Sequence, residues 1–273
     1  MDNFISVIIP NRNGEATIGR CLQAVFLSQY ANFEVIAVDD ASTDNSVETI
    51  KQFPCRLIRL NKHSGASKAR NAGAFNSRGD VLFFIDADCV IKEDTLSIVD
   101  KTVAEKGADV IIGGTYTKMP YDKRFFSVFQ SVFVNYSETK NVDSPDYIAT
   151  HAMVIAAEIF GKAGGFSEDF LPILEDVEFS HRLRRAGYRL VIAPEIQVRH
   201  IFNYSLSKSI RNAVRKSMYW TMYSIKNRDL FTDSGTASVE LKVNGISWFL
   251  IIGFLISQAV LRNTLIFYYA VPA

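Results

Sequence analysis

The sequence predicts an α/β protein with a Rossmann-like, mostly parallel sheet flanked by helices, followed by interfacial or hydrophobic helices at the C-terminus. In the first half of the 273-residue chain, short apolar runs rich in Val, Ile and Phe alternate four times with segments of helical length. Polar residues directly follow several of these runs. A strand–helix–strand order favours right-handed crossovers between parallel strands, and ligands bind beyond the carboxyl ends of such strands. We therefore expect the functional residues just after the strands.

The expected strands are short apolar runs of the kind that is buried on both faces of a sheet. They cover residues 4–9, 33–38, 55–60, 81–85, 110–112, 152–156 and 188–192. The expected helices carry apolar residues at intervals of three and four. They cover residues 15–29, 44–52, 65–76, 93–105, 123–138 and 175–186. Gly187 follows the last of these helices and is typical of a C-terminal cap.

The composition is that of an ordinary globular protein. Hydrophobic residues make up 48% and charged residues 22% of the chain, which argues against a disordered or collagen-like protein. The three cysteines form no Cys-x-x-Cys pair, so the chain is neither a small disulfide scaffold nor a zinc finger, and a reducing compartment is expected. The first residues lead directly into an apolar strand without a basic region, and no signal peptide is expected.

The net charge is only +1, but basic residues are concentrated in one segment. Residues 199–228 hold seven Lys and Arg side chains and no Asp or Glu. Such a block favours a polyanion or an anionic membrane surface as its partner. The uncharged stretch 243–261 follows. As a helix it would rise about 28 Å, so it could span a bilayer or form a buried or interfacial helix, whereas residues 264–271 are too few to span alone.

Within the basic segment, apolar residues form one helical stripe: Leu206, Ile210, Val214, Met218, Met222 and Ile225. Four basic residues lie off this stripe: Lys208, Arg211, Arg215 and Lys216. A basic amphipathic helix is typical of the surface of an anionic bilayer, on the cytoplasmic face of the cell membrane. The alternative is a helix packed on the preceding domain. The expected divisions are an α/β domain at 1–202, a basic interfacial region at 203–230 and a hydrophobic membrane-associated segment at 243–273.

Carboxylates follow two of the expected strands. Asp86 and Asp88 come directly after the apolar run 81–85. Mg²⁺ and Mn²⁺ prefer oxygen ligands and usually bind one or two carboxylates together with substrate phosphates, so this pair predicts a divalent cation site. Asp39 and Asp40 end another strand. Adjacent carboxylates at a buried strand end repel each other unless a cation or a hydrogen-bonding ligand compensates.

Five motifs occur in order between residues 4 and 200. They are SVIIPNRNG, FEVIAVDDASTD, GASKARNAGAFNSRGDVLFFIDAD, GGF and LEDVEFSHRLRRAGYRL. In this order and spacing they resemble the inverting nucleotide-sugar glycosyltransferases of family 2, of the membrane-associated bacterial type. The resemblance implies the GT-A fold and Mn²⁺ or Mg²⁺ as cofactor.

The resemblance implies that residues near the first strands bind the nucleotide. Asp40 matches the carboxylate that accepts the imide hydrogen of uracil, and Pro10 and Asn13 belong to the loop that packs the nucleoside. A buried carboxylate is selective here, because an analogue without the imide donor leaves it unpaired. Arg70, with Lys68 beside it, matches a cation next to the nucleotide, although an ordinary surface helix would also carry these two residues.

The resemblance also assigns the metal ligands and the base. Asp86 and Asp88 match the metal motif, with Asp88 as the direct ligand, and His200 matches a histidine that completes the metal or diphosphate site. Asp176, next to Glu175, matches the general base that takes the proton of the acceptor hydroxyl. A positioned base contributes about 10² to 10⁴ in rate. A Glu-Asp pair at a helix start is also favoured by the helix dipole alone.

These features predict an inverting, metal-dependent glycosyltransferase that moves a sugar from a nucleotide-sugar, a UDP-sugar in the first instance, to a hydroxyl of a lipid-linked or cell-surface glycan. The expected partners are this donor, the acceptor and a membrane surface, and not nucleic acid. Two alternatives stay open: a polyprenyl-phosphate sugar synthase, which needs no base, and a non-catalytic membrane scaffold on the same fold. Three further histidines, His63, His151 and His181, are expected to have surface or packing roles.

Overall fold

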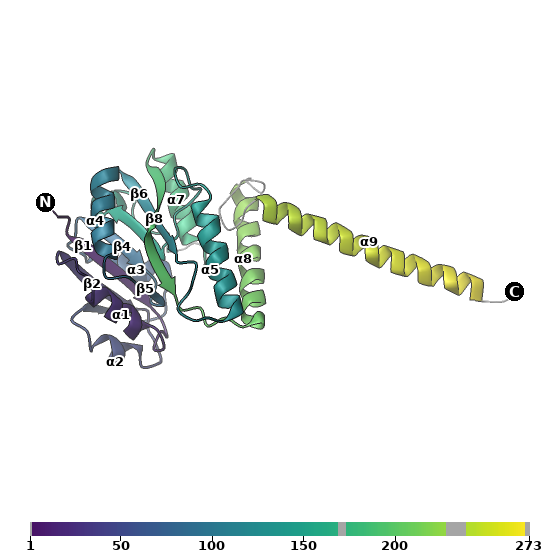
Figure 1. Ribbon diagram of the computed structural model, residues 1–273, viewed down its shortest axis with the longest axis horizontal. Coiled ribbons are helices and arrows are strands. Elements are labelled where there is room, and N and C mark those ends of the chain that lie inside the picture. The colour runs from purple at the N-terminus through teal and green to yellow at the C-terminus, as the bar shows by residue number, and fades with distance from the viewer. Residues whose placement is uncertain (1, 169–172, 228–238, 271–273) are drawn as a thin grey trace.

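The structure is a computed structural model that describes residues 2–168, 173–227 and 239–270. An eight-stranded sheet in the order β3-β2-β1-β4-β7-β6-β8-β5 crosses the molecule, with helices on both of its faces (Figure 1). The strands are β1 (Ile5–Asn11), β2 (Phe33–Asp39), β3 (Arg56–Arg59), β4 (Val81–Ile85), β5 (Cys89–Ile91), β6 (Val110–Tyr116), β7 (Ala152–Ala156) and β8 (Arg189–His200). The helices are α1 (Ile18–Phe26), α2 (Ser46–Ile50), α3 (Ala66–Phe75), α4 (Thr95–Lys106), α5 (Phe125–Thr139), α6 (Ala157–Lys162), α7 (Glu175–Arg185), α8 (Leu206–Asn227) and α9 (Val239–Ala270).

The sheet is parallel in its first half and mixed in its second. Strands β3, β2, β1 and β4 run parallel, as predicted. In contrast, β7 is antiparallel to both β4 and β6, and β5 is antiparallel to β8. Only residues 86–88 separate β4 from β5, which is too few for a crossover to a parallel strand. The alternation of elements therefore predicts a mostly parallel sheet correctly but misses the short strand β5 and the reversed direction of β7.

Strand β8 is longer than the predicted run 188–192 and extends to His200. Pro194 and Glu195 interrupt the apolar pattern because both are exposed, although the strand continues on either side of them. Its register against β6 shifts once along its length. The far end of β8 then pairs with β5, where His200 lies opposite Cys89. This extension brings a histidine from late in the chain to the end of β4.

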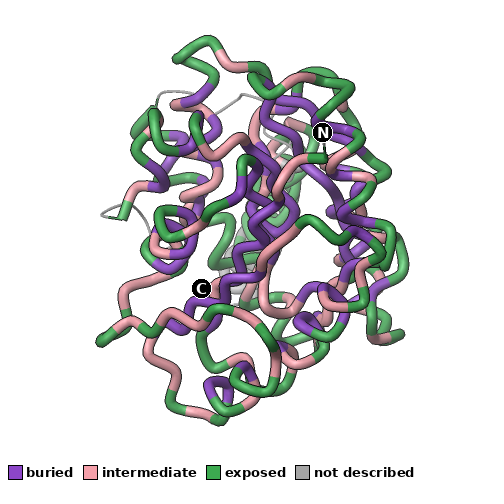
Figure 2. The backbone as a smooth tube through the Cα atoms, turned by 90° about the vertical axis from the view of Figure 1, so that its left-hand side faces the viewer, coloured by how far each residue is buried: buried purple, intermediate pink, exposed green. Residues whose placement is uncertain are grey.

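Buried residues run through the interior of the molecule (purple in Figure 2), and they form core clusters on both faces of the sheet. Val7 and Ile9 belong to the core cluster on one side, and Ile8 to the cluster on the other. The second cluster contains four buried phenylalanines: Phe84, Phe160, Phe166 and Phe179. Gly165 precedes one of them with φ +72°, and a Cβ at this position would lie 2.6 Å from Oδ1 of Asn71. The Gly-Gly-Phe turn therefore requires a glycine here.

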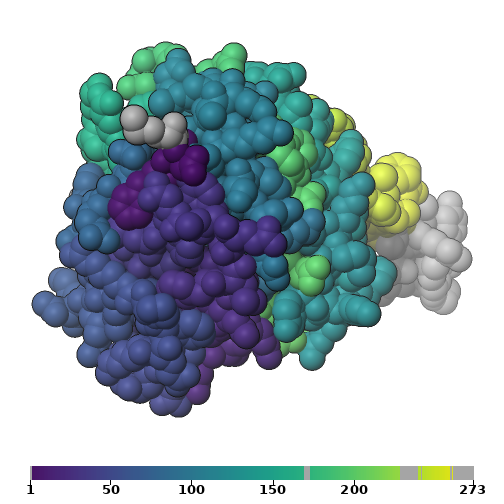
Figure 3. Space-filling model, turned by 60° about the vertical axis from the view of Figure 1, so that its left-hand side comes forward, coloured from purple at the N-terminus to yellow at the C-terminus, as the bar shows by residue number. Residues whose placement is uncertain are grey.

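The two halves of the chain form one body. In the space-filling view the N-terminal half, purple to blue, lies against the second half, teal to green (Figure 3). Helix α8 lies along this body beside α5, and α9 extends away from it (Figure 1). Within the described residues, the structure contains no helix that is both long and apolar enough to cross a membrane. The predicted stretch 243–261 falls in α9. For residues 259 and 261–270 the structure describes the backbone but not the side chains.

Candidate active site

The ends of β4 and β8 bring two predicted metal ligands together. Asp88 follows β4, and His200 closes β8 opposite Cys89. Nε2 of His200 lies 3.3 Å from Oδ1 of Asp88. The ligand atoms of Asp88, Cys89 and His200 all lie within 4.8 Å of one another. This is a candidate site for a divalent cation.

The chemistry of these groups fits such a cation. Burial and the charge of Asp86 raise the pKa of Asp88 to about 7, so a bound cation would compensate a carboxylate that is costly to ionise. Burial lowers the pKa of His200 to about 3, which keeps the imidazole neutral, as metal binding requires. Burial raises the pKa of the Cys89 thiol well above its ordinary value. Of the three groups, the Asp88 carboxylate and the His200 imidazole are therefore the candidate ligands, and a carboxylate with an imidazole suits Mn²⁺ better than Mg²⁺.

Arg70 connects the end of β4 to the start of α7. Its side chain is 5% exposed, and its guanidinium donates to Oδ1 of Asp86 at 2.8 Å and to Oε1 of Glu175 at 2.6 Å. Although burial opposes it, the neighbouring Arg70 charge lowers the pKa of Asp86. Asp86 was predicted both as a metal ligand and as a nucleotide contact. In this structure its carboxylate is paired with Arg70 and lies outside the Asp88–Cys89–His200 group.

A cavity of about 330 Å³ lies in front of these residues. Five of the predicted site residues line it: Arg70, Asp86, Glu175, Asp176 and His200. They come from α3, the end of β4, the start of α7 and the end of β8. The cavity is therefore shared by Asp176, which the sequence predicts as the base, by Asp86 and by His200, which contacts Asp88. Asp88 itself does not line the cavity.

Asp176 has the electrostatic surroundings of a proton acceptor. Leu174, in a left-handed conformation with φ +76°, begins the first turn of α7 and sets the carboxylates of Glu175 and Asp176 at the cavity wall. Burial and the charge of Glu175 raise the pKa of Asp176 to about 7, against the opposing effect of Arg70. A carboxyl group whose pKa lies near the working pH is suited to general base catalysis.

The predicted nucleoside-binding residues lie at the ends of β1 and β2. Asp40 is 3% exposed and accepts hydrogen bonds from the backbone N–H groups of Ser64 at 2.7 Å and Gly65 at 2.9 Å. Nδ1 of His63 lies 2.7 Å from the same carboxylate. Asp39 is satisfied separately, by Asn11 and by the N–H of Ser42. Hydrogen bonds therefore compensate these adjacent carboxylates.

The loop after β1 is held by its own polar contacts. Asn13, in a left-handed conformation with φ +49°, accepts a hydrogen bond from the N–H of Thr43 at 2.8 Å, and Pro10 lies at the end of β1. Lys68 is placed elsewhere: its Nζ pairs with Glu168 at 3.3 Å, and it does not line the cavity. The structure therefore separates Lys68 from Arg70, although both lie on α3.

The lining residues that were not predicted as functional include a buried pair, His151 and Glu138. His151 is 7% exposed, stacks on Tyr116 at a centroid distance of 4.0 Å, and has its Nε2 3.3 Å from Oε1 of Glu138. Although burial opposes it, the Glu138 charge raises the pKa of His151. No motif marks this pair, because Glu138 lies on α5 and His151 directly before β7. His181, in contrast, has the predicted packing role, since it bonds to Tyr223 of α8 at 2.7 Å.

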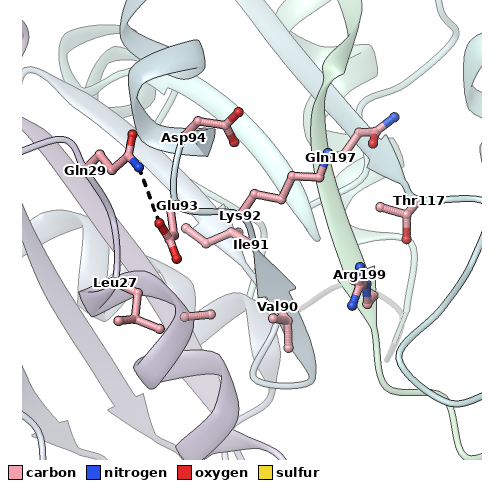
Figure 4. Close-up of a pocket in the computed structure, with 11 residues that line it drawn as sticks. Leu27, Gln29, Val90, Ile91, Lys92, Glu93, Asp94, Thr117, Gln197 and Arg199 are labelled. Atoms are coloured by element: carbon pink, nitrogen blue, oxygen red, sulfur yellow. Dashed lines mark hydrogen bonds between the residues drawn. The ribbon is translucent and has the colours of Figure 1, made fainter.

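A larger cavity of about 550 Å³ lies beside α1, β5 and β8 (Figure 4). Charged and polar side chains such as Lys92, Glu93 and Arg199 line it, and Gln29 donates a hydrogen bond to Glu93 at 3.3 Å. None of the predicted site residues belongs to it. The converging carboxylates and histidines make the smaller cavity the candidate active site.

Comparisons with known proteins agree with the resemblance in the sequence. The profile of Glycosyl transferase family 2 matches residues 6–156, more than half of the 273-residue chain. The chain therefore belongs to glycosyltransferase family 2. It is 33% identical to glycosyltransferase GlyG of Streptococcus pneumoniae over 131 residues, which cover 46% of this chain and 44% of GlyG. The chain thus spans less than half the length of that relative.

Solved structures share the fold. S. aureus TarS 1–349 in complex with UDP matches with a TM-score of 0.58 and 20% identity, over 71% of this chain and 59% of that chain. The mannosyltransferase PcManGT from Pyrobaculum calidifontis, in complex with GDP-Man and Mn²⁺, matches with a TM-score of 0.59 and 17% identity, over 79% of this chain and 65% of that chain. These likenesses confirm the predicted α/β architecture of the GT-A type.

Proposed function

We propose that this protein is an inverting glycosyltransferase that moves a sugar from a nucleotide-sugar, in the first instance a UDP-sugar, to a hydroxyl group of a lipid-linked or cell-surface glycan. The observation that carries the proposal is the shared cavity. Asp176 lines the same space as Asp86 and as His200, the partner of Asp88. A base and a diphosphate-binding region on two walls of one cavity are what a single displacement needs.

In the proposed reaction, Asp176 accepts the proton of the acceptor hydroxyl. The hydroxyl oxygen forms a bond to the anomeric carbon while the bond from that carbon to the diphosphate oxygen breaks, and the electron pair leaves with the nucleoside diphosphate. Asp88 and His200 would hold Mn²⁺ or Mg²⁺, which supplies positive charge near the diphosphate. Arg70 fixes the two walls relative to each other through Asp86 and Glu175.

The nucleoside would occupy the region beside the ends of β1 and β2. Asp40 lies there in a ring of N–H donors, with the imidazole of His63 exposed above it. Asp40 is only 3% exposed, so a uracil imide would reach its carboxylate only if a neighbouring group, such as the exposed imidazole of His63, moved aside. The assignment of UDP as the nucleotide therefore rests on the sequence motif that contains Asp40. GDP is the alternative nucleotide whose binding should be measured beside that of UDP.

We also propose that α8 lies on an anionic membrane at the cytoplasmic face. One side of the helix packs on the body through the buried residues Trp220 and Tyr223. The predicted apolar stripe points away from this contact, and its six residues are 49–64% exposed. Basic residues flank the stripe, as in helices that bind anionic bilayers.

A panel of nucleotide-sugars tests the enzymatic proposal. The full chain is incubated with UDP-glucose, UDP-galactose, UDP-N-acetylglucosamine or GDP-mannose, with Mn²⁺ or EDTA, and with or without membrane lipid extract. We expect metal-dependent release of free nucleotide from one donor, stimulated by the extract and lost in Asp176→Asn. Binding of UDP or GDP without release from any donor would favour the scaffold alternative instead.

A further inference from the structure

Helix α8 forms one wall of the candidate active site. Four of its residues line the cavity: Asn212, Arg215, Lys216 and Trp220. The helix is fixed there by a small apolar cluster in which Trp220 and Tyr223 pack against Leu174 and Val177 of the α7 region. The bond between Tyr223 and His181 adds a second attachment. The wall is therefore tied to the same helix that carries Asp176.

Lys216 is a cation without a fixed partner in this wall. Within the described residues it makes no ion pair of 4.0 Å or less, although Asp86, Asp176 and Glu138 line the same cavity. These acids have other contacts. Asp86 is paired with Arg70, and Glu138 accepts from Thr115 at 2.8 Å and faces His151.

The position of Lys216 also relates it to the candidate cation site. Its charge and that of Lys208 act on His200, the partner of Asp88. Burial lowers the pKa of Lys216, and the surrounding acids oppose this effect. Arg70, the buried cation of the cavity, already donates to two carboxylates. Lys216 is thus placed to donate to an anionic ligand without first breaking an ion pair.

Resting on the proposed function, we infer that Lys216 binds a phosphate oxygen of the nucleoside diphosphate in the cavity that it lines together with Arg70. The diphosphate gains negative charge when its bond to the sugar breaks, and a cation in the cavity wall stabilises that charge. An ammonium group is a common donor to phosphate. Lys216 is then a donor-binding residue supplied by α8, and α8 is part of the catalytic unit.

Titration calorimetry of the full chain with UDP and with uridine, each with Mn²⁺, tests this inference; GDP and guanosine replace them if the wild type prefers GDP. We expect Lys216→Met to weaken diphosphate binding about 10- to 100-fold, since a hydrogen bond to a charged group is lost. Uridine binding should not change, because it has no phosphate. Lys216→Arg should restore most of the affinity. Lys101→Met, which removes an exposed cation of α4, is the matched control.

The outcomes separate the two levels of the proposal. If the wild type binds neither UDP nor GDP, the proposed function fails and this inference fails with it. If the wild type binds a diphosphate and Lys216→Met binds it equally well, only the role of Lys216 is overturned. Lys216→Met could also bind the diphosphate as well as the wild type does but show a raised KM for a phosphate-bearing acceptor. This result would assign Lys216 to the phosphate of the acceptor and would overturn its assignment to the nucleotide. Thermal unfolding of each variant shows whether it is folded.

Discussion

Arg70 and Glu175 are 105 positions apart in the sequence, yet Nη1 of Arg70 donates to Oε1 of Glu175 at 2.6 Å. The same guanidinium reaches Asp86. Through this one side chain, α3 holds the start of α7 against the end of β4. The spacing between the proposed base and the diphosphate side of the cavity therefore depends on an internal ion network.

Replacing Arg70 by Met should destabilise the fold. The change leaves Asp86 and Glu175 partly buried without their cation, and breaking such a pair costs about 3–5 kcal/mol. Urea unfolding followed by circular dichroism measures the effect. Lys68→Met, on the same helix, removes an exposed pair with Glu168 and should change the free energy of unfolding by about 1 kcal/mol or less. Equal effects of the two variants would contradict the bridging role of Arg70.

Asp176→Asn should lower kcat by about 10² to 10⁴ while donor binding is retained, because the amide cannot accept the hydroxyl proton. Steady-state rates and donor affinity are measured on the same preparation. Glu158→Gln, which changes an exposed carboxylate on α6, serves as the control. Unchanged turnover of Asp176→Asn with a polyprenyl phosphate acceptor would favour the synthase that needs no base.

The raised pKa of Asp176 predicts two pH dependences. Only the ionised carboxylate is a base, so kcat/KM should rise as pH increases through about 7. Stability should respond in the opposite direction. The folded protein keeps a proton on Asp176 that the unfolded chain releases near its ordinary value of 3.8, so stability contributed by this group falls as pH rises from about 4 to 7.

Thermal unfolding at several pH values checks the second dependence. Asp176→Asn should be more stable than the wild type at pH 8, and the difference should shrink toward pH 4, where both side chains are neutral. A difference that does not vary with pH would show that the carboxylate is not held in its protonated form by the fold.

His200→Ala and Asp88→Asn should each weaken Mn²⁺ binding about tenfold or more, since both proposed donors lie at one site. Electron paramagnetic resonance of free Mn²⁺ measures this directly, without an activity assay. Asp109→Asn, at an exposed carboxylate before β6, is the control. If Asp86→Asn alone abolished binding while these two variants retained it, Asp86 would be the ligand, after release from Arg70.

The combined change Ile210→Asn, Val214→Asn and Met218→Asn should reduce binding of the protein to anionic vesicles. These side chains are 50–64% exposed, so the fold should be little affected. Co-sedimentation with phosphatidylglycerol and phosphatidylcholine vesicles, at low and high salt, measures the loss. Val132→Asn, at another exposed apolar position on α5, is the control. Equal sedimentation of the triple variant and the wild type would argue against a membrane contact through this stripe.

The sequence predicts the first half of the fold well, because continuous apolar runs and Gly-rich turns are local signals. The carboxylates that its motifs mark, among them Asp86 and Asp176, line one cavity. Strand β5 is missed because it is only three residues long, and the extension of β8 is missed because exposed Pro194 and Glu195 break the pattern. His151 and Glu138 come together only through packing of α5 against the sheet. The stripe of α8 is visible in the sequence, but its opposite face gives no periodic signal that Lys216 lines a cavity.

One side of α8 lines the cavity, and the other side carries the exposed apolar stripe. The thickness of α8, a helix of 22 residues, therefore sets the distance between the candidate active site and any surface that the outer side of the helix contacts. If that is a lipid sheet, the reach of the enzyme is fixed at about one helix diameter, roughly 10 Å. The enzyme would then favour acceptors whose reactive sugar lies at about this distance from the membrane surface, independently of any contact with the sugar itself.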